Sequence, residues 1–502
     1  MQVLLLILVA AVMLPSNGES PVGDVATIAI VLGTTAIIVL AGAAHATVLR
    51  RGLDGPGGLR RLERANRTMR WMQRGVVVTV VVGVVGLGFR ESVRGLIGDP
   101  PLLDEALSLA PALVGITVAW WIFHPFEQRS RESMLLRRLD LGLPVQAPPA
   151  RAAWVAIQVR SQLLVLLAPF ALLVLGGESM RLLIGGFDAA PPWLSIAGSV
   201  AVFGLVALVA PAIVVRLVGA KSMPPGEVRD ALESMCRATG VRVRDLLIWP
   251  TGGLVVNAGV TGLVAPLRWV MLTDGLLETL ERRQVLAVMA HELGHVRRHH
   301  MPWMGLAVVA IAVGLGVVLD PVAAAVREWR WSLGGDLDAA MRDLDRIDLA
   351  TTAVVLVGVL IGFGWVSRRF ERQADAFAAA SMSDLEPLGP GPDDRPPMDP
   401  APGTVTRLGV ESMATALSAV AHANGVPMQR FTWRHGSIES RRRHLRTLAG
   451  VARSGLPIDR VVRAIKVGSV LMVIGGLGWW WATQPDATSE PSTGVAASEV
   501  GS

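Results

Sequence analysis

The chain has 502 residues, of which 52% are hydrophobic and only 18% charged, and its mean hydropathy is +0.49. This composition excludes an ordinary soluble protein and predicts that most of the chain lies in a membrane. The net charge of +6 comes largely from arginines clustered between apolar runs, a pattern that indicates membrane orientation and argues against a nucleic-acid partner.

Residues 1–217 are predicted to form a membrane bundle of about five or six spans. The runs long enough to cross a bilayer as helices are 25–49, 106–124, 161–177 and 189–215. Residues 75–89 form a shorter run, but the arginines at its ends allow a short span. Residues 1–14 have the length of a signal-peptide core without a basic start or a clear cleavage site, so we expect a first short span, with a cleaved signal as the alternative.

The remaining chain is predicted to alternate between a mixed catalytic domain and the membrane. The first half of that domain is 218–300, with helices at 226–239 and about 283–298 and strands at 241–249, 253–257 and 267–272. The segment 301–367 is a membrane hairpin with spans at 301–319 and 349–367. The second half is 368–466, with a Pro-rich loop at 383–405 and helices at 404–424 and 438–448. A last span at 467–484 and a tail at 485–502 follow it.

Arginine counts set the expected orientation. The segment 50–74 carries eight arginines against two acids, whereas 90–105 carries two arginines against four acids. The first segment is therefore predicted to be cytoplasmic, and the alternation places 216–300 and 368–466 on the same side and the acid-rich 320–348 outside. A lone Cys236 excludes an internal disulfide framework and fits a reducing compartment.

The stretch His291-Glu292-Leu293-Gly294-His295 carries the strongest chemical signal. Residues four apart lie one above the other on a helix, so His291 and His295 can offer their imidazoles to one zinc ion. Glu292 then lies beside that face and can act as the general base toward a water that the metal activates. Three fixed positions also occur by chance, with His291 as an ordinary helix residue and His295 as a cap, so the rest of the chain must decide.

A hydrolytic zinc site needs a third protein ligand, and the candidates are His299, His300, Glu328 and Glu371. On a straight helix His299 would lie about one turn, roughly 6 Å, beyond the ion, and a helix-end histidine is the better interpretation. Glu328 is predicted to lie on the outer side of the membrane, opposite HELGH. Glu371 follows a span on the same side as HELGH, with Asp375 one turn along, so Glu371 can complete the site and Asp375 can orient a ligand histidine. The metzincin spacing fails, because position 301 is Met.

Here the chain resembles a family. Asp274-Gly275-Leu276-Leu277, HELGH, a two-span hairpin and Glu371-Arg372-Gln373-Ala374-Asp375 are similar in order and spacing to the membrane gluzincin peptidases, which include bacterial HtpX and the type I CAAX prenyl protease (Ste24-like). The resemblance covers about residues 221–450. It implies a polytopic α-helical membrane protein with a cytoplasmic α+β gluzincin (HExxH) metallopeptidase domain.

Further site residues are implied by this resemblance. Asn257 begins a segment similar to the family's Asn-Ala-x-x-x-Gly and would align the substrate strand. His435-Gly436-Ser437, followed by Arg441, is similar to His-Pro-Ser and Glu-Arg, and His435 and Arg441 would stabilise the oxyanion or the substrate carbonyl. The chain departs from the pattern where Gly436 replaces proline and Ser440 replaces the acid, so a surface histidine among arginines is the alternative for His435.

The expected activity is that of an integral membrane zinc endopeptidase with one zinc ion, acting on membrane or membrane-associated proteins in protein quality control. An Arg-rich chain without organelle signals favours a bacterial inner membrane, with the active site facing the cytoplasm. The expected partners are a peptide or protein substrate and membrane lipid, and the sequence sets no oligomeric state. The alternatives are a CAAX-type processing protease, a zinc-binding scaffold or sensor without turnover, and a transporter, which the near absence of ionisable residues within the spans disfavours.

Overall fold

The structure is a computed structural model that describes residues 2–13, 20–55, 57–98, 100, 102–140, 149–185, 192–253, 255–334, 336–385 and 403–483. It divides into two compact units, each assembled from segments that are distant in sequence. The first unit comprises Met1–Met223, Val243–Val255 and Thr261–Glu278. The second comprises Pro224–Arg242, Val256–Val260 and Thr279–Ser502. Most of the predicted loop at 383–405, residue 484 and the predicted tail lie outside the described residues.

Eight helices in the described part of the chain are long and apolar enough to cross a membrane. They are Asp24–Arg50, Gly58–Leu87, Leu103–Glu132, Arg151–Gly185, Leu194–Val218, His300–Ser332, Leu337–Met382 and Arg453–Ala482. Each of the seven longer runs predicted from the sequence overlaps one of these helices, and the shorter run 75–89 overlaps Gly58–Leu87, although residues 189–191 and 484 lie outside the described residues. The chain is a multi-pass integral membrane protein.

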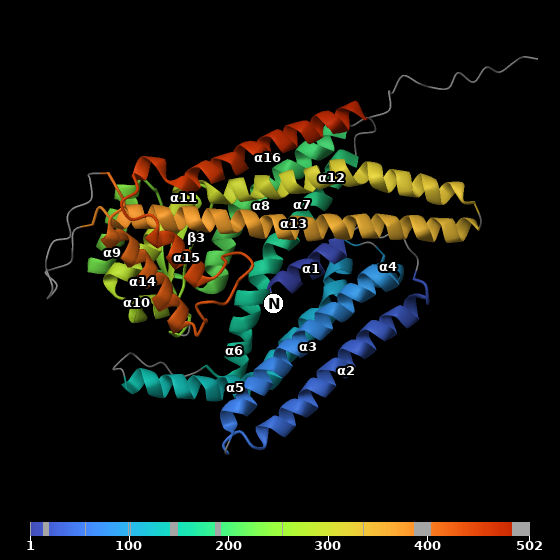
Figure 1. Ribbon diagram of the computed structural model, residues 1–502. Helices are drawn as coiled ribbons and strands as arrows, with labels where there is room; N and C mark the ends of the chain where they lie inside the picture. Colours follow the sequence, from blue (N-terminus) through green and yellow to red (C-terminus); the bar gives the residue numbers. More distant parts are fainter. Residues whose placement is uncertain are drawn as a thin grey trace, which may run out of the picture. The chain divides into compact units, whose positions relative to one another are not determined.

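The first unit is a helical bundle followed by a small sheet (Figure 1). Its helices are α1 (Gln2–Met13), α2 (Asp24–Arg50), α3 (Gly58–Leu87), α4 (Phe89–Ile97), α5 (Leu103–Asp140), α6 (Arg151–Gln158), α7 (Val165–Gly185) and α8 (Pro192–Val218), with a π-helical stretch at Val159–Leu164. Helix α3 packs against α1, α2 and α5, and its Val76, Val77 and Val80 are fully buried. The short α1 buries Leu5 and Leu8 in the same core, as its uniformly apolar sequence favours.

The sheet of the first unit contains β1 (Lys221–Ser222), β2 (Asp245–Trp249) and β4 (Trp269–Thr273), and it leads into α10 (Asp274–Thr279). β2 pairs with β1 in antiparallel and with β4 in parallel orientation. The predicted strand at 253–257 is wrong for the described residues there, because Gly252 and Gly253 have φ of 70° and 74° and turn the chain. Asp274 fixes this turn by accepting hydrogen bonds from the Thr251 and Gly252 N–H groups, at 3.0 and 2.8 Å.

The second unit surrounds the helix that carries HELGH. Its helices are α9 (Glu227–Thr239), α11 (Arg282–Arg297), α12 (His300–Ser332), α13 (Leu337–Met382), α14 (Arg407–Ala423), α15 (Ile438–Arg446) and α16 (Pro457–Ala482), with a 3₁₀ turn at Arg453–Gly455. The strand β3 (Ala258–Thr261) belongs to this unit except for its last residue, Thr261. Helices α9, α13 and α14 pack against α11, and α16 lies along α12 and α13 (Figure 1).

Helices extend further than the apolar runs alone predict. Residues 58–74, expected as an Arg-rich loop, are the first half of α3, and most of the expected acid-rich loop at 320–348 is helical in α12 and α13. Ion pairs between the two helices hold this extension together, with Arg330 2.8 Å from Asp343 and Arg327 2.6 Å from Asp348. Charged faces that pair with each other allow helices to continue beyond an apolar segment.

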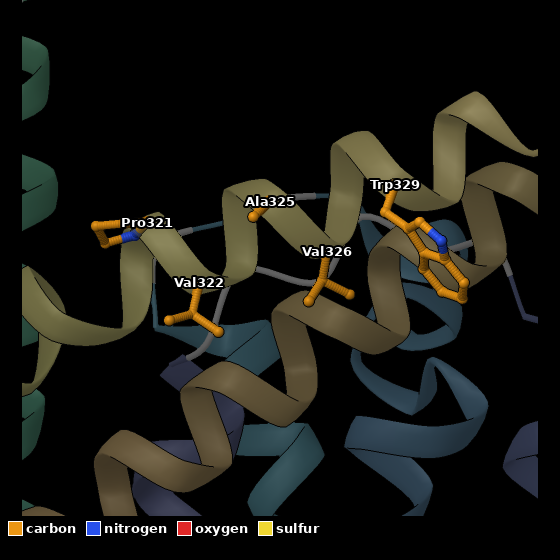
Figure 2. A pocket seen from close by; sticks show the side chains of 5 residues that line it. All are labelled: Pro321, Val322, Ala325, Val326 and Trp329. Carbon is orange, nitrogen blue, oxygen red and sulfur yellow. The ribbon is translucent and has the colours of Figure 1, made fainter.

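An apolar hollow lies on the distal half of α12 and is lined by Pro321, Val322, Ala325, Val326 and Trp329 (Figure 2). It offers hydrocarbon and an indole edge, and none of its lining residues is a carboxylate, imidazole or thiol. At a helical rise of about 1.5 Å per residue, its nearest residue is about 30 Å along α12 from His300. The hollow is therefore separate from the HELGH region.

Candidate metal centre and active site

Helix α11 places His291 and His295 on one face. It begins with a capping box, in which the Glu281 side chain accepts from the backbone of Gln284 and the Gln284 side chain accepts from the Glu281 N–H. Its apolar face buries Leu286, Met289 and Leu293. Since one face is anchored in the core and the first turn is capped, the two histidines have a fixed direction.

Helix α13 brings the carboxylates to this face. Glu371 and Asp375 are separated by one turn and are buried, with exposed fractions of 6% and 0%. The two helices approach closely at Gly294, where an added Cβ would lie 3.1 Å from a Phe377 ring carbon and 3.3 Å from the Ala374 Cα. The glycine of HELGH therefore permits the short distance between the histidines and the carboxylates.

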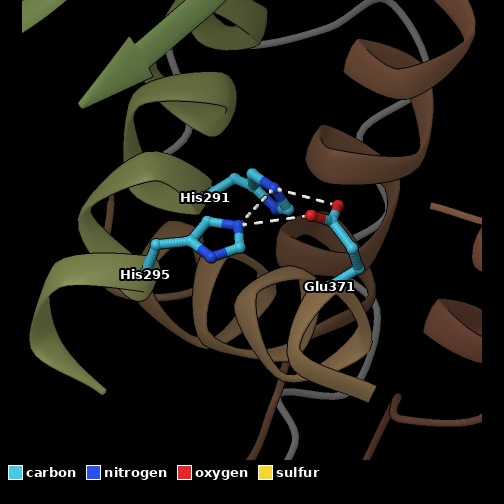
Figure 3. Close-up of side chains that lie close together, drawn as sticks. All are labelled: His291, His295 and Glu371. Atoms are coloured by element: carbon cyan, nitrogen blue, oxygen red, sulfur yellow. Dashed lines mark hydrogen bonds and ion pairs between the residues drawn. The ribbon is translucent and has the colours of Figure 1, made fainter. Parts of the chain in front are cut away.

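Three ligand atoms converge in the space between α11 and α13 (Figure 3). The Nε2 atoms of His291 and His295 are 3.2 Å apart, and each lies 3.6 Å from an oxygen of Glu371. Tetrahedral ligands held at about 2.0–2.1 Å from zinc are roughly 3.3 Å from one another. The spacing and the two-imidazole, one-carboxylate donor set fit a zinc ion with one further coordination position.

Asp375 and Arg441 lie behind the ligands. Oδ1 of Asp375 is 3.0 Å from Nδ1 of His291, although the N–H is not well aligned for a hydrogen bond. Arg441 donates to both oxygens of Asp375, at 2.8 and 2.6 Å, and its Nη1 is 3.3 Å from Glu371. Ser437 caps α15 by accepting from the Ser440 N–H, so Arg441 projects from a helix with a fixed start.

Burial and neighbouring charges separate the pKa values of the residues in HELGH. Burial, together with the charge of His291, lowers the pKa of His295 to about 3, which keeps this imidazole neutral as a metal ligand must be. Burial also acts to lower the pKa of His291, but the carboxylates of Asp375 and Glu371 together outweigh it, and the net pKa is raised. Burial raises the pKa of Glu292 to about 7, a value suited to a group that takes up and releases a proton.

A segment of extended chain passes Glu292. The Val260 N–H in β3 faces the Glu292 carboxyl and acts to lower its pKa, against the larger effect of burial. Asn257 lies just before β3 and is exposed. The segment is held by Asn424, which the sequence analysis missed: its side chain accepts from the Val256 N–H at 3.2 Å and donates to the Val256 carbonyl at 2.8 Å. No pattern in the sequence connects these residues, which are 168 positions apart.

His435 reaches the same carboxylate from a tight turn. Its Nδ1 is 3.1 Å from Glu371, and its side chain is 45% exposed. Thr432 and Gly436 exchange two backbone hydrogen bonds, and Gly436 has φ of 76°, which a proline could not adopt. The departure from the His-Pro-Ser pattern therefore corresponds to a different backbone, while the histidine still reaches the site.

The structure places the predicted residues as follows. His291, His295, Glu292, Glu371, Asp375, His435 and Arg441 belong to one cluster of side chains. The contacts of Arg441 are with carboxylates, so its predicted role toward the substrate carbonyl stays a prediction. His299 has φ of 55° and an exposed side chain, because α11 ends before it and α12 begins after it. The buried His300 instead contacts His295, with 2.9 Å between their Nδ1 atoms.

Comparisons with known proteins agree with this geometry. Residues 225–389 match the model of peptidase family M48. A protease HtpX homolog of Caldanaerobacter subterraneus subsp. tengcongensis is 32% identical over 33% of this chain and 52% of that protein. The HtpX homologs of Thermoanaerobacter pseudethanolicus and Chlorobium phaeobacteroides are 29% and 28% identical, over 62% and 52% of their own lengths.

The matches span about half of the length of most of these relatives. A crystal structure of S. mikatae Ste24p aligns with 83% of this chain and 98% of its own, with 14% identity and a TM-score of 0.43. The segment matched by the family contains both HELGH and Glu371. Residues 225–389 are thus similar to peptidase family M48, and the chain shares this similarity with the HtpX homologs.

Proposed function

We propose that this protein is a zinc-dependent endopeptidase that hydrolyses peptide bonds at a single-metal site. The observation that carries the proposal is the convergence of the His291 and His295 Nε2 atoms on Glu371, with Glu292 beside them. Zinc held there would act as a Lewis acid toward a water and the substrate carbonyl. The donor set and spacing support zinc over magnesium or calcium, which prefer oxygen ligands.

The protein's own groups would perform the proton transfers and the alignment. Glu292 takes the proton from the attacking water and then gives it to the leaving amine, a task for which its raised pKa is suited. The extended segment at Asn257 and β3 passes Glu292 and aligns an extended substrate backbone beside it. His435 is partly exposed at the Glu371 side of the site and stabilises the charge that develops on the carbonyl oxygen.

The proposed setting is the cytoplasmic face of a bacterial inner membrane, with membrane or membrane-associated proteins as substrates in quality control. The distribution of arginines supports this side, since 50–74 and 368–466 are basic whereas 320–348 is rich in acids. The relatives named as HtpX homologs are bacterial proteases, which supports a proteolytic role over CAAX processing.

The test compares wild type with Glu292→Gln, both purified in detergent with zinc. We expect both to bind zinc, and we expect cleavage of casein or of the chain itself to fall by about 10²–10⁴-fold in the variant, because the general base is lost. Equal cleavage by the two proteins would refute the mechanism. Zinc binding without cleavage in either protein would favour the scaffold or sensor.

A further inference from the structure

A line of polar contacts leads from His295 to the last membrane helix. Nδ1 of His295 is 2.9 Å from Nδ1 of His300, and Nε2 of His300 is 2.8 Å from Oε1 of Gln373. The Gln373 amide then donates to Asp459 at 2.5 Å. The other oxygen of Asp459 accepts from Arg298 at 3.3 Å. The contacts cross from α11 to the start of α12, then to α13 and α16.

The line is buried where it meets the metal centre. His300 is fully buried and Gln373 is 4% exposed. The His300 ring stacks on Phe370, with ring centroids 4.6 Å apart and an angle of 16° between the planes. This packing prevents the imidazole from turning over, because one face stacks on Phe370 and both nitrogens have fixed neighbours.

The contacts specify the direction of every hydrogen bond. The Asp459 carboxylate can only accept, so the NH₂ group of Gln373 must face it and the Gln373 oxygen must face His300. That oxygen can only accept, so the His300 proton is on Nε2 and its lone pair is on Nδ1. His295 must then carry its proton on Nδ1, which leaves the lone pair of its Nε2 directed at His291 and Glu371.

We propose that His300, Gln373 and Asp459 form a positioning relay that holds His295 in its metal-binding tautomer and orientation. The relay is the counterpart of Asp375, which faces Nδ1 of the other ligand, His291, at 3.0 Å. It places the anchor for one ligand on α16, a helix that carries none of the site residues. The proposal rests on the proposed metal site but assigns residues beyond it.

The experiment measures zinc affinity by competition with a coloured chelator, together with the thermal midpoint of the zinc-free protein. His300→Phe keeps the stacking on Phe370 but removes both nitrogens, and we expect zinc affinity to fall about 10- to 100-fold. Asp459→Asn acts at the far end, where an amide can face Gln373 in either direction, so we expect a smaller loss of about 3- to 10-fold. Gln373→Met breaks the middle of the relay, and its loss of zinc affinity should lie between those of the other two variants.

The matched control is His299→Asn, since asparagine tolerates positive φ and the side chain at this position is exposed. It should bind zinc as wild type does. Affinity within twofold of wild type in both His300→Phe and Asp459→Asn would overturn the relay, and so would a loss confined to His300→Phe. If His300→Phe does not fold, zinc affinity within twofold of wild type in both Gln373→Met and Asp459→Asn would overturn the relay. A wild-type protein that binds no zinc would instead refute the metal site itself, and the relay with it.

Discussion

Two buried charge clusters in the described part of the chain differ in their balance. In the first unit, Arg90 and Arg94 face Asp104 and Glu105, with contacts of 2.8 Å from Arg90 to Glu105 and 2.5 Å from Arg94 to Asp104. In the second unit, the carboxylates of Glu292, Glu371 and Asp375 share a single arginine, Arg441, which contacts the last two.

The difference indicates which cluster binds a ligand. Burying a charge without compensation costs several kcal/mol, so a balanced cluster is complete by itself. An excess of carboxylates beside two imidazoles is compensated when a divalent cation binds, because the cation supplies the missing positive charge. We therefore assign a structural role to the cluster around Arg90 and a metal-binding role to the cluster around Arg441.

The largest expected effect is loss of the metal when a ligand is removed from the unbalanced cluster. Glu371→Gln should lower zinc affinity by more than the roughly 10- to 100-fold that outer partners contribute, because a ligand atom and its charge are lost. Equilibrium dialysis with metal analysis measures this change. Asp104→Asn is the matched control, and its zinc affinity should equal that of wild type. Equal zinc loss in both variants would contradict the assignment.

A smaller effect is expected from exchanging an arginine for lysine in each cluster. Arg441→Lys should lower zinc affinity about 10- to 100-fold, because a point charge cannot hold both oxygens of Asp375 while also reaching Glu371. Arg90→Lys should leave zinc affinity unchanged. Equilibrium dialysis with metal analysis measures the zinc affinity of both variants. Unchanged affinity in Arg441→Lys would show that Asp375 orients His291 without the arginine.

Removal of the metal should lower the thermal stability of the wild-type protein and leave that of Glu371→Gln unchanged. At free zinc of about 100 times Kd, binding stabilises the folded state by about 2.7 kcal/mol, and a chelator withdraws this contribution. Scanning calorimetry in detergent should show a lower Tm for wild type after chelation and no shift for Glu371→Gln. A shift of equal size in the variant would mean that the stabilising metal lies elsewhere.

The smallest effect is expected at the helix contact. Gly294→Ala should lower activity about 2- to 10-fold, because the new Cβ forces α11 and α13 apart by a few tenths of an ångström, and misplaced catalytic groups lose rate steeply. The control is Gly305→Ala in α12, where an added Cβ meets nothing within 4 Å. Activity assays on both variants decide, and an unchanged rate in Gly294→Ala would show that the site tolerates the separation.

Local periodicity predicted which of the candidate ligand side chains share a helical face. His291 and His295, and likewise Glu371 and Asp375, are each separated by one helical turn, and this spacing alone predicts that each pair shares a face. The apolar runs predicted the membrane helices for a different local reason, because a membrane span needs only sufficient length and an apolar composition.

Tertiary contacts and backbone geometry account for what the sequence did not predict. The relay through His300 exists because His299 adopts a left-handed conformation that interrupts the helix, and a helical projection of the sequence cannot show such a break. Because the chain turns at Gly252 and Gly253, the strand lies at Ala258–Thr261 and not at the predicted 253–257. The polarity of the charged extensions of α3, α12 and α13 predicts loops, but the helices continue through them.

Helix α13 runs without interruption from Leu337 to Met382 and carries both a membrane span and Glu371. Glu371 is four residues past the predicted end of that span, which is about 6 Å along the helix axis. A continuous helix keeps this distance between the span and Glu371 fixed. On the proposed function, this fixed distance would set how far from its own membrane boundary a substrate is cut, before any side-chain preference applies.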